Sequence, residues 1–251
     1  MEEIRISHVS KSYTTLSTDL VIGSARRPSR TRKILEDVNL TFPAEQLSVL
    51  VGRSGCGKST LLKMLAGKES PDSGEISLPN GWHAALLSPE PYVITWTNVR
   101  QNVAMASGVG KTPEERYEHA LEYVRLVGLE DYADLSPVEL STGMKQRLGL
   151  ARVLASQAEL LLMDEPFASL DFITRAELQT QVLQLQKSMP RTIVLVTHQL
   201  DEALLLGQRI TVMHELGATE TFDLSHLPYP RDLTSPELLA LREAVTEACR
   251  R

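Results

Sequence analysis

Cysteine is scarce in this chain: only Cys56 and Cys249 occur among 251 residues. Their spacing fits neither a disulfide framework nor a zinc site, so a reducing cytoplasm is the expected environment. No apolar run approaches the roughly 20 residues that cross a bilayer, and residues 1–3 do not open a secretory signal sequence. A basic excess is also missing, since the net charge is −6, which excludes nucleic acid binding driven by bulk charge. We therefore expect a cytoplasmic protein that reaches a membrane only through a partner.

What the chain does contain is a series of short aliphatic runs separated by helical patterns. Runs of this kind are buried on both faces, so they favour a parallel α/β sheet covered by helices. Residues 3–9 (EIRISHV) instead alternate apolar and polar, which is typical of a half-exposed antiparallel strand. The length suits one α/β domain with a smaller antiparallel β subdomain. The aliphatic runs are 47–51 (LSVLV), 160–163 (LLLM), 192–197 (TIVLVT) and, more weakly, 209–213 (RITVM).

The middle of the chain changes to a helical pattern. Residues 112–115 form a capping box with proline at the first helical position, and Gly128 is placed to end this helix. Residues 136–139 repeat the capping pattern. We therefore expect a helical subdomain inserted into the α/β core. The expected parts are the core at 1–87 and 157–215, the helical insertion at 88–156 and a C-terminal extension at 216–251.

Residues 14–33 (TTLSTDLVIGSARRPSRTRK) are polar, basic and aperiodic. One interpretation is a solvated surface loop, which is the usual state of a run of like charges. The other is a regulatory segment or a contact with anionic lipid. Both interpretations place the segment in a loop at the surface. The cations available for such a contact are Arg26, Arg27, Arg30, Arg32 and Lys33.

Residues 52–59 read GRSGCGKS, between the aliphatic run at 47–51 and the helical pattern STLLKMLAG. This strand–loop–helix order is the context that the phosphate-binding P-loop, G-x-x-x-x-G-K-[ST], requires. Its glycines let successive N–H groups converge on phosphate oxygens, and the helix N-terminus adds its dipole. We expect Lys58 to reach the β- and γ-phosphates, Ser59 to bind Mg²⁺ and Thr60 to touch the α-phosphate. The predicted phosphate-binding set is Gly52, Arg53, Ser54, Gly55, Cys56, Gly57, Lys58, Ser59 and Thr60.

Residues 159–166 (ELLLMDEP) supply the acidic groups that a P-loop needs from a neighbouring strand. Asp164 is expected to hold Mg²⁺ through water, and Glu165 to polarise the attacking water. A solvated pair of carboxylates is the alternative, although an aliphatic run leads directly into them. His198 follows the run at 192–197, at the sheet edge where ligands bind in open α/β folds. A lone histidine is often structural, but this position predicts a contact with the γ-phosphate.

A second anion-binding pattern lies at 140–147 (LSTGMKQR), where two hydroxyl side chains and a glycine open a helix. This stretch resembles the signature motif of the ATP-binding cassette (ABC) ATPases, and it precedes 159–166 as it does in that family. ASLD at 168–171 is similar to the family's D-loop. Tyr13 stands where an aromatic side chain of the family stacks on adenine. In this order, the motifs extend the resemblance over essentially the whole chain.

The resemblance implies ATP and Mg²⁺ as ligands and a head-to-tail dimer, either of identical chains or with a second ABC ATPase. Ser141 and Gly143, with the helix dipole, would then contact the γ-phosphate of the nucleotide held by the other chain. Glu165, His198 and Lys58 would carry the hydrolysis itself. The family fold that this implies is a P-loop NTPase core of the RecA-like kind, with an antiparallel β subdomain and an inserted helical subdomain.

Two positions depart from the family pattern. Thr142 replaces the usual glycine of the signature motif, which adds a side chain but leaves the contacts of its neighbours intact. Pro89, in PEPYVITW at 89–96, replaces the glutamine that contacts Mg²⁺ and the water and reports bound ATP to the transporter. Proline has neither an amide side chain nor an N–H. We therefore expect slower or differently coupled hydrolysis, with Ser88 or Glu90 as candidate substitutes for the missing glutamine.

The lack of a membrane-spanning run favours a separate ATPase subunit of an importer, docked on permease subunits that a solute-binding protein serves. The tail at 226–245 is similar to the ending of ATPases that energise uptake of nitrate, sulfonates and taurine. The alternative is an ABC-type regulator with little turnover, which Pro89 and the basic residues at 26–33 favour. A simple P-loop kinase would leave 140–147 without a role. We therefore expect an importer ATPase, peripheral on the inner face of the cell membrane and without nucleic acid partners.

Overall fold

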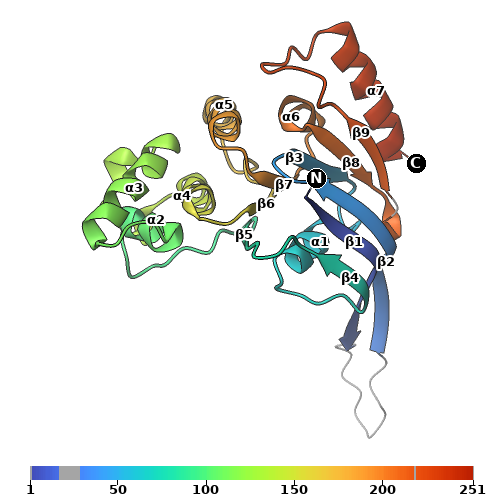
Figure 1. Cartoon of the computed structure of the whole chain (residues 1–251), viewed down its shortest axis with the longest axis horizontal. Helices are drawn as coiled ribbons and strands as arrows, with labels where there is room; N and C mark the ends of the chain where they lie inside the picture. Colours follow the sequence, from blue (N-terminus) through green and yellow to red (C-terminus); the bar gives the residue numbers. More distant parts are fainter. Residues whose placement is uncertain (1, 17–28, 218, 251) are drawn as a thin grey trace, which may run out of the picture.

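The computed structural model describes residues 2–16, 29–217 and 219–250. Within these residues the larger sheet has six strands in the order β5-β6-β7-β3-β8-β9 (Figure 1). The first five run parallel, and β9 runs antiparallel to β8. The four aliphatic runs are confirmed as β3, β6, β7 and β8. The strands are β3 (Leu47–Gly52), β5 (Ala84–Leu87), β6 (Leu160–Asp164), β7 (Thr192–Val196), β8 (Arg209–Met213) and β9 (Thr219–Asp223).

The register of the sheet brings the ends of three strands to one edge. Val196 of β7 lies opposite both Leu50 of β3 and Asp164 of β6. The P-loop leaves β3 two residues after Leu50, so the acidic pair and the P-loop start from the same edge. Because ligands bind at the carboxyl ends of parallel strands, this edge is where a site is expected.

Alternate residues of the central strands face two different cores. Leu160 and Leu162 pack with α1 and the smaller sheet, whereas Leu161 and Met163 pack with the helices on the other face. All four are almost completely buried. This explains why the runs are continuously aliphatic: a parallel strand covered on both sides has no solvent-facing position. The covering helices include α1 (Lys58–Leu65), α5 (Phe172–Ser188), α6 (Leu200–Leu206) and α7 (Pro236–Arg250).

The smaller sheet is antiparallel, in the order β2-β1-β4. Its strands are β1 (Glu3–Leu16), β2 (Ser29–Pro43) and β4 (Ser73–Ser77). The predicted antiparallel strand at 3–9 is confirmed, but the loop predicted for 14–33 is wrong at both ends, because β1 and β2 extend into it as a hairpin. The β-branched Thr14 and Thr31 lie opposite each other with their hydroxyl oxygens 3.1 Å apart, a pairing that favours strand. Arg26 and Arg27 lie outside the described residues.

Three helices, α2 (Val99–Ser107), α3 (Pro113–Leu126) and α4 (Thr142–Ala155), gather beyond the β5 edge of the larger sheet (Figure 1). Thr112 and Glu115 form the predicted capping box of α3, and Gly128 follows its end with φ +65°. The capping pattern at 136–139 is also present, but it opens only a 3₁₀ turn, η2 (Pro137–Glu139). Leu140 is extended after this turn, so α4 starts afresh at Thr142. The other 3₁₀ turns are η1 (Glu130–Tyr132) and η3 (Glu215–Gly217).

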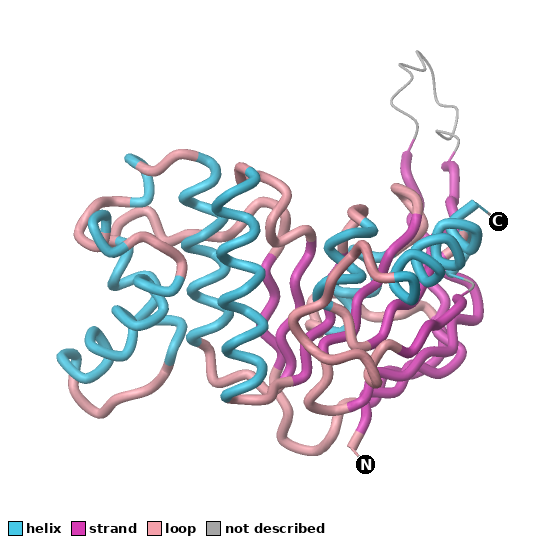
Figure 2. Tube along the Cα trace, turned by 90° about the horizontal axis from the view of Figure 1, so that it is seen from above, coloured by secondary structure: helices cyan, strands magenta, loops and turns pink. Residues whose placement is uncertain are grey.

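Seen from above, one end of the molecule is almost entirely helical, whereas the other end combines the strands with helices that include the C-terminal one (Figure 2). Among the residues that the structure describes, no helix has the length and apolar character needed to cross a bilayer. The α/β fold class expected from the sequence is confirmed by this arrangement. The exact division into core, helical insertion and C-terminal extension stays a prediction.

Candidate functional site

The P-loop connects β3 to α1 at the carboxyl edge of the larger sheet. Gly52 has φ +153°, and a Cβ there would lie 2.3 Å from the carbonyl oxygen of Met213. Gly57, the N-cap of α1, has φ +105°, and a Cβ there would lie 2.5 Å from Cδ2 of Leu35. Any side chain at either position would overlap its neighbours in a backbone conformation that favours glycine. These two glycines therefore allow the tight turn that the motif predicts.

Lys58 holds the loop together from within. Its Nζ donates hydrogen bonds to the carbonyl oxygens of Gly52 (2.8 Å) and Arg53 (2.9 Å) and lies 3.6 Å from Sγ of Cys56. The side chains of Lys58 and Cys56 are both buried, so Cys56 lies beneath the loop. A phosphate oxygen is a stronger partner for an ammonium group than a carbonyl or a thiol. The same ammonium group can thus exchange these bonds for an anion that enters the loop.

Asp164 ends β6 as a nearly fully buried carboxylate, 5% exposed. Burial raises the pKa of Asp164, and the charge of Glu165 adds to this, while a hydrogen bond with Ser59 and the charge of Lys58 oppose it. A bound cation would stabilise the ionised form. The hydroxyl of Ser59 and this carboxylate are oxygen ligands of the kind that Mg²⁺ prefers, usually with water and phosphate completing the shell. In the described residues no cluster of three or more His, Cys, Asp or Glu could hold a metal alone.

Glu165 and His198 face each other at the ends of β6 and β7. Oε1 of Glu165 lies 3.2 Å from Nδ1 of His198. The Glu165 backbone has φ +50°, and its N–H donates to the carbonyl oxygen of Val196 at 2.9 Å. Its own carbonyl accepts a hydrogen bond from Nε2 of Gln146 on α4 at 3.4 Å. The backbone of Glu165 is thus held by the sheet and by the helix that carries the signature motif.

Lys58, Glu165 and His198 line one cavity of about 430 Å³, whereas the buried side chains of Asp164 and Cys56 do not line it. Three lining residues were not among the predicted site residues: Arg32, Ile34 and Val196. Val196 lies two residues before His198 and could have been included, whereas Arg32 and Ile34 are placed only by the register of β2 against β1. The predicted residues that the structure brings together in this cavity are Gly52, Ser54, Gly55, Gly57, Lys58, Ser59, Thr60, Glu165 and His198.

Two predicted ligand residues point elsewhere. Nη2 of Arg53 donates to the carbonyl oxygen of Arg250 on α7 at 3.3 Å, so only the Arg53 backbone belongs to the loop region. The hydroxyl of Tyr13 donates to Glu69, and Nζ of Lys11 lies 5.8 Å from the centre of its ring. Tyr13 is 37% exposed and lies outside the cavity. Its stacking on adenine stays a prediction.

The signature motif forms the start of α4. Ser141 is the N-cap, and its Oγ accepts a hydrogen bond from the N–H of Met144 at 3.3 Å. Ser141 and Thr142 are exposed, and neither they nor Gly143 line the P-loop cavity. A Cβ on Gly143 would lie 3.2 Å from the carbonyl oxygen of Ser169, in the ASLD segment. The two anion-binding patterns are therefore separate within one chain, and the tip of α4 is open to solvent.

The segment that carries Pro89 crosses from β5 to α2 without regular structure. Its aromatic side chains are the most exposed part of it: Tyr92 is 74% exposed and Trp96 77%. Ser88 and Glu90, the candidate substitutes for the missing glutamine, do not line the P-loop cavity; Ser88 lines a different groove, described below. Substitution for the glutamine by Ser88 or Glu90 stays a prediction.

Known proteins match the chain over most of its length. A taurine import ATP-binding protein of Pseudomonas aeruginosa is 39% identical over 207 residues, covering 79% of this chain and 78% of the relative. An aliphatic sulfonates import ATP-binding protein of Shouchella clausii is 35% identical over 226 residues, covering 90% and 89%. Among solved structures, a dimeric bacterial ABC transporter cassette is 25% identical with a TM-score of 0.76, covering 88% of this chain and 98% of that one.

A family model also matches. Residues 35–168 fit the family described as "ABC transporter", which is more than half of the chain. The resemblance stated from the motifs is thereby confirmed, as is the P-loop NTPase fold that it implied. The chain belongs to the ABC transporter family.

Proposed function

We propose that this chain is the ATP-hydrolysing subunit of an ABC importer, acting on a separate membrane permease from the inner face of the cell membrane. The supporting observation is the convergence of Lys58, Glu165 and His198 on one cavity in a chain of this family. Relatives named for taurine and aliphatic sulfonate import support a small solute of the nitrate, sulfonate or taurine kind.

Co-purification from membranes tests this proposal. We expect a tagged chain to bring down a multispan permease, and the reconstituted complex to hydrolyse ATP faster when a solute-binding protein loaded with sulfonate is added. Recovery of the chain without any permease, and with ATP binding but little turnover, would instead support the ABC-type regulator.

Hydrolysis follows from positioning and charge stabilisation, as in other phosphoryl transfers. Lys58 and the P-loop N–H groups bind the β- and γ-phosphates, and Glu165 takes the proton of the attacking water. His198 is 3.2 Å from Glu165 and contacts the γ-phosphate from the same strand edge. Ser59 and, through water, Asp164 would hold Mg²⁺, which would supply positive charge near the phosphates.

Dimerisation gives the second anion-binding pattern its role. The tip of α4 is exposed and remote from the P-loop cavity of its own chain, so it can cap a nucleotide held by another chain. Ser141, Gly143 and the positive end of the helix dipole then contact the γ-phosphate. Two chains packed head-to-tail, or one chain and a second ABC ATPase, thus enclose ATP between them, with Tyr13 stacked on each adenine. The dimeric state of the solved cassette named above supports this arrangement.

The absence of the expected glutamine favours blunted coupling and lends the regulator some support. We expect Pro89→Gln to raise solute-stimulated ATPase of the full complex severalfold, because it restores an amide that can contact Mg²⁺ and water. Steady-state phosphate release, with and without solute, measures this. Pro190→Gln is the matched control, since Pro190 is exposed and lines neither the P-loop cavity nor the groove described next. Equal turnover and equal stimulation in wild type and Pro89→Gln would reject the idea.

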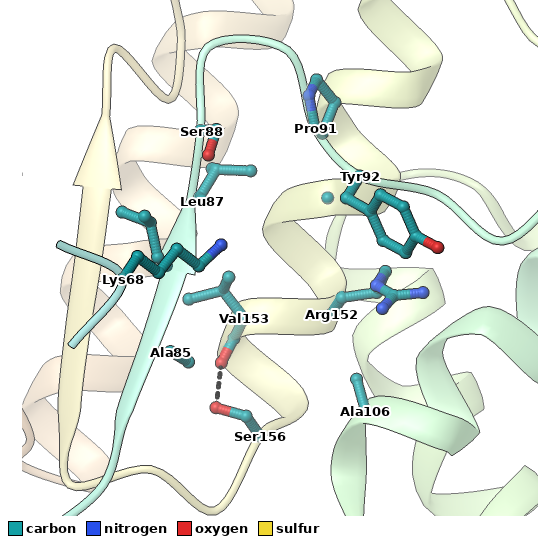
Figure 3. A pocket seen from close by; sticks show the side chains of 12 residues that line it. Lys68, Ala85, Leu87, Ser88, Pro91, Tyr92, Ala106, Arg152, Val153 and Ser156 are labelled. Atoms are coloured by element: carbon teal, nitrogen blue, oxygen red, sulfur yellow. Dashed lines mark hydrogen bonds between the residues drawn. The ribbon is translucent and has the colours of Figure 1, made fainter. Parts of the chain in front are cut away.

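The permease contact belongs to a groove of about 330 Å³ between the β5 edge and α4. It takes in part of the segment at 88–100, including the exposed ring of Tyr92. Figure 3 shows this ring beside the guanidinium of Arg152, with Lys68 on the other side of the hollow. In the described part of the chain, neither Lys68 nor Arg152 has a carboxylate within 4.0 Å. The groove therefore suits a helical permease segment that carries an acidic side chain.

Arg152 is the stronger argument for an acidic partner. Its Nη1 donates to Oδ1 of Asn102 at 2.8 Å, which satisfies one donor with a neutral group. Burial lowers the pKa of Arg152, so desolvation of this charge is not offset by an ion pair. A partner carboxylate would offset it on binding.

We expect Lys68→Glu to weaken binding of the permease about tenfold, because it places like charge against the acidic segment. Titration of the chain onto permease held in lipid nanodiscs measures this. Lys187→Glu on α5 is the charge-matched control, since Lys187 is also exposed and lies outside the groove. If both variants bind like wild type, the groove is not the electrostatic contact.

A further inference from the structure

One cation at the P-loop cavity does not belong to any motif of the sequence. Arg32 lies on β2, in the hairpin with β1, yet it lines the same cavity as Lys58, Glu165 and His198. Its Nη2 would lie 3.6 Å from a Cβ placed on Gly55, so the guanidinium reaches the tip of the P-loop. A residue far outside the loop thus adds a second full positive charge to the phosphate side of the cavity.

Within the part of the chain that the structure describes, no acidic side chain neutralises this charge. Among residues 2–16, 29–217 and 219–250, no carboxylate lies within 4.0 Å of the Arg32 guanidinium. The next residue behaves differently: Nζ of Lys33 lies 2.6 Å from Oε1 of Glu36. Successive side chains of a strand point to opposite faces, so Arg32 faces the cavity while Lys33 is engaged elsewhere. The described strands of this hairpin therefore present a guanidinium without a carboxylate partner to the anion that the P-loop holds.

The position opposite Arg32 on the neighbouring strand is Tyr13. Directly opposite residues of an antiparallel pair place their side chains on the same face. One short piece of hairpin thus carries both the aromatic side chain expected at the base and the cation at the phosphates.

We propose that Arg32 binds the phosphate chain of the nucleotide from the β2 side, as a nucleotide-binding residue outside the P-loop motif. This rests on the proposed function, because it takes ATP as the ligand of the cavity. The planar guanidinium can donate two parallel hydrogen bonds to phosphate oxygens, which an ammonium group cannot. Arg32 also gives the basic end of the 14–33 segment a role at the site in place of a lipid contact.

The test measures binding of fluorescent ADP and fluorescent AMP to the purified full-length chain at two salt concentrations. We expect Arg32→Gln to weaken ADP binding about tenfold, as loss of a charge-assisted contact does, and to weaken AMP binding less. The loss is expected to shrink at high salt. Arg32→Lys keeps the positive charge but lacks the planar guanidinium, so its affinity for ADP is expected to lie between those of wild type and Arg32→Gln. Lys33→Gln removes a cation from the adjacent residue and is expected to bind like wild type.

Three results would overturn the proposal. The first is that Arg32→Gln binds ADP as tightly as wild type does, and the second is that it binds ADP more tightly, which would mean that the guanidinium blocks the phosphate position. The third is an equal loss of affinity for AMP and ADP, which would place the contact at the base or ribose. Lys58→Ala separates these outcomes from failure of the proposed function. If wild type binds no nucleotide, or if Lys58→Ala binds as well as wild type, the cavity is not the ATP site and the proposal falls with it. If only Lys58→Ala loses affinity, the proposed function stands and the Arg32 contact alone is rejected.

Discussion

Glu165→Gln is expected to lower steady-state ATP hydrolysis at least about 100-fold and to leave the chain as an ATP-bound dimer. Loss of a general base typically costs 10²- to 10⁴-fold, on the order of this effect. Glutamine keeps the shape of the side chain and can still meet Nδ1 of His198, which lies 3.2 Å from Oε1 of Glu165. Lys58 and Asp164 are untouched, so nucleotide binding and closure of the dimer persist while the water is no longer activated. Phosphate release and size exclusion with and without Mg-ATP measure the two effects.

The matched control is Glu177→Gln, which makes the same chemical change at an exposed position on α5. It should hydrolyse ATP like wild type and remain in the same monomer–dimer equilibrium. A Glu165→Gln chain that stays monomeric with ATP, yet hydrolyses at the normal rate, would contradict the assignment of Glu165. If Glu165→Gln loses hydrolysis but does not dimerise with ATP, the role of Glu165 as general base stands and the ATP-bound dimer is rejected.

The parts of the site that could be predicted from sequence are those in which a strand runs directly into a functional residue. β3 leads into Gly52 and β6 ends at Asp164, and both strands are mostly aliphatic because helices and the smaller sheet cover their two faces. Parallel strands end at a shared edge, so local patterns suffice to bring the P-loop and the acidic pair together. His198 follows by the same argument from β7.

The parts that could not be predicted depend on pairing between distant segments. Arg32 reaches the cavity because β2 pairs with β1 in a register that places it opposite Tyr13, and that register contains several irregularities. The polar, aperiodic sequence of 14–33 does not predict the pairing of β2 with β1. Gly149 is a similar case: a Cβ there would lie 2.5 Å from Cβ of Pro91, so a helical glycine is explained only by a neighbour far away in sequence.

The signature motif is different again, because its ligand is not in the same chain. Ser141 caps α4 and the helix tip is exposed, so within one chain the motif is a well-formed helix start with no ligand. The motif gains a ligand only if a second chain brings a phosphate to this helix N-terminus, which is suited to bind anions. Within one chain, the P-loop cavity and the signature motif are therefore separate, and an experiment on the dimer must test whether they bind the same nucleotide.

Gly143→Asp is expected to abolish ATP-dependent dimerisation and to lower hydrolysis about 100-fold, while each isolated chain still binds nucleotide normally. A carboxylate at the tip of α4 would meet the γ-phosphate held by the other chain and repel it. Aspartate is tolerated in the first turn of a helix, where the dipole favours negative charge, so the fold should persist. Equilibrium nucleotide binding, size exclusion with Mg-ATP and phosphate release measure the three effects.

Gly143→Ala shows whether the effect of Gly143→Asp comes from its charge or from the size of the added side chain. A Cβ at this position would lie 3.2 Å from the carbonyl oxygen of Ser169, a tight contact that a shift of a few tenths of an ångström relieves. The alanine variant should therefore keep most of its activity, and the aspartate variant should lose it through repulsion. If Gly143→Asp dimerises and hydrolyses like Gly143→Ala, then no phosphate comes near this helix, and ATP is not enclosed between two chains. The P-loop cavity would then work alone, and a kinase or a single-chain ATPase would have to replace the importer mechanism.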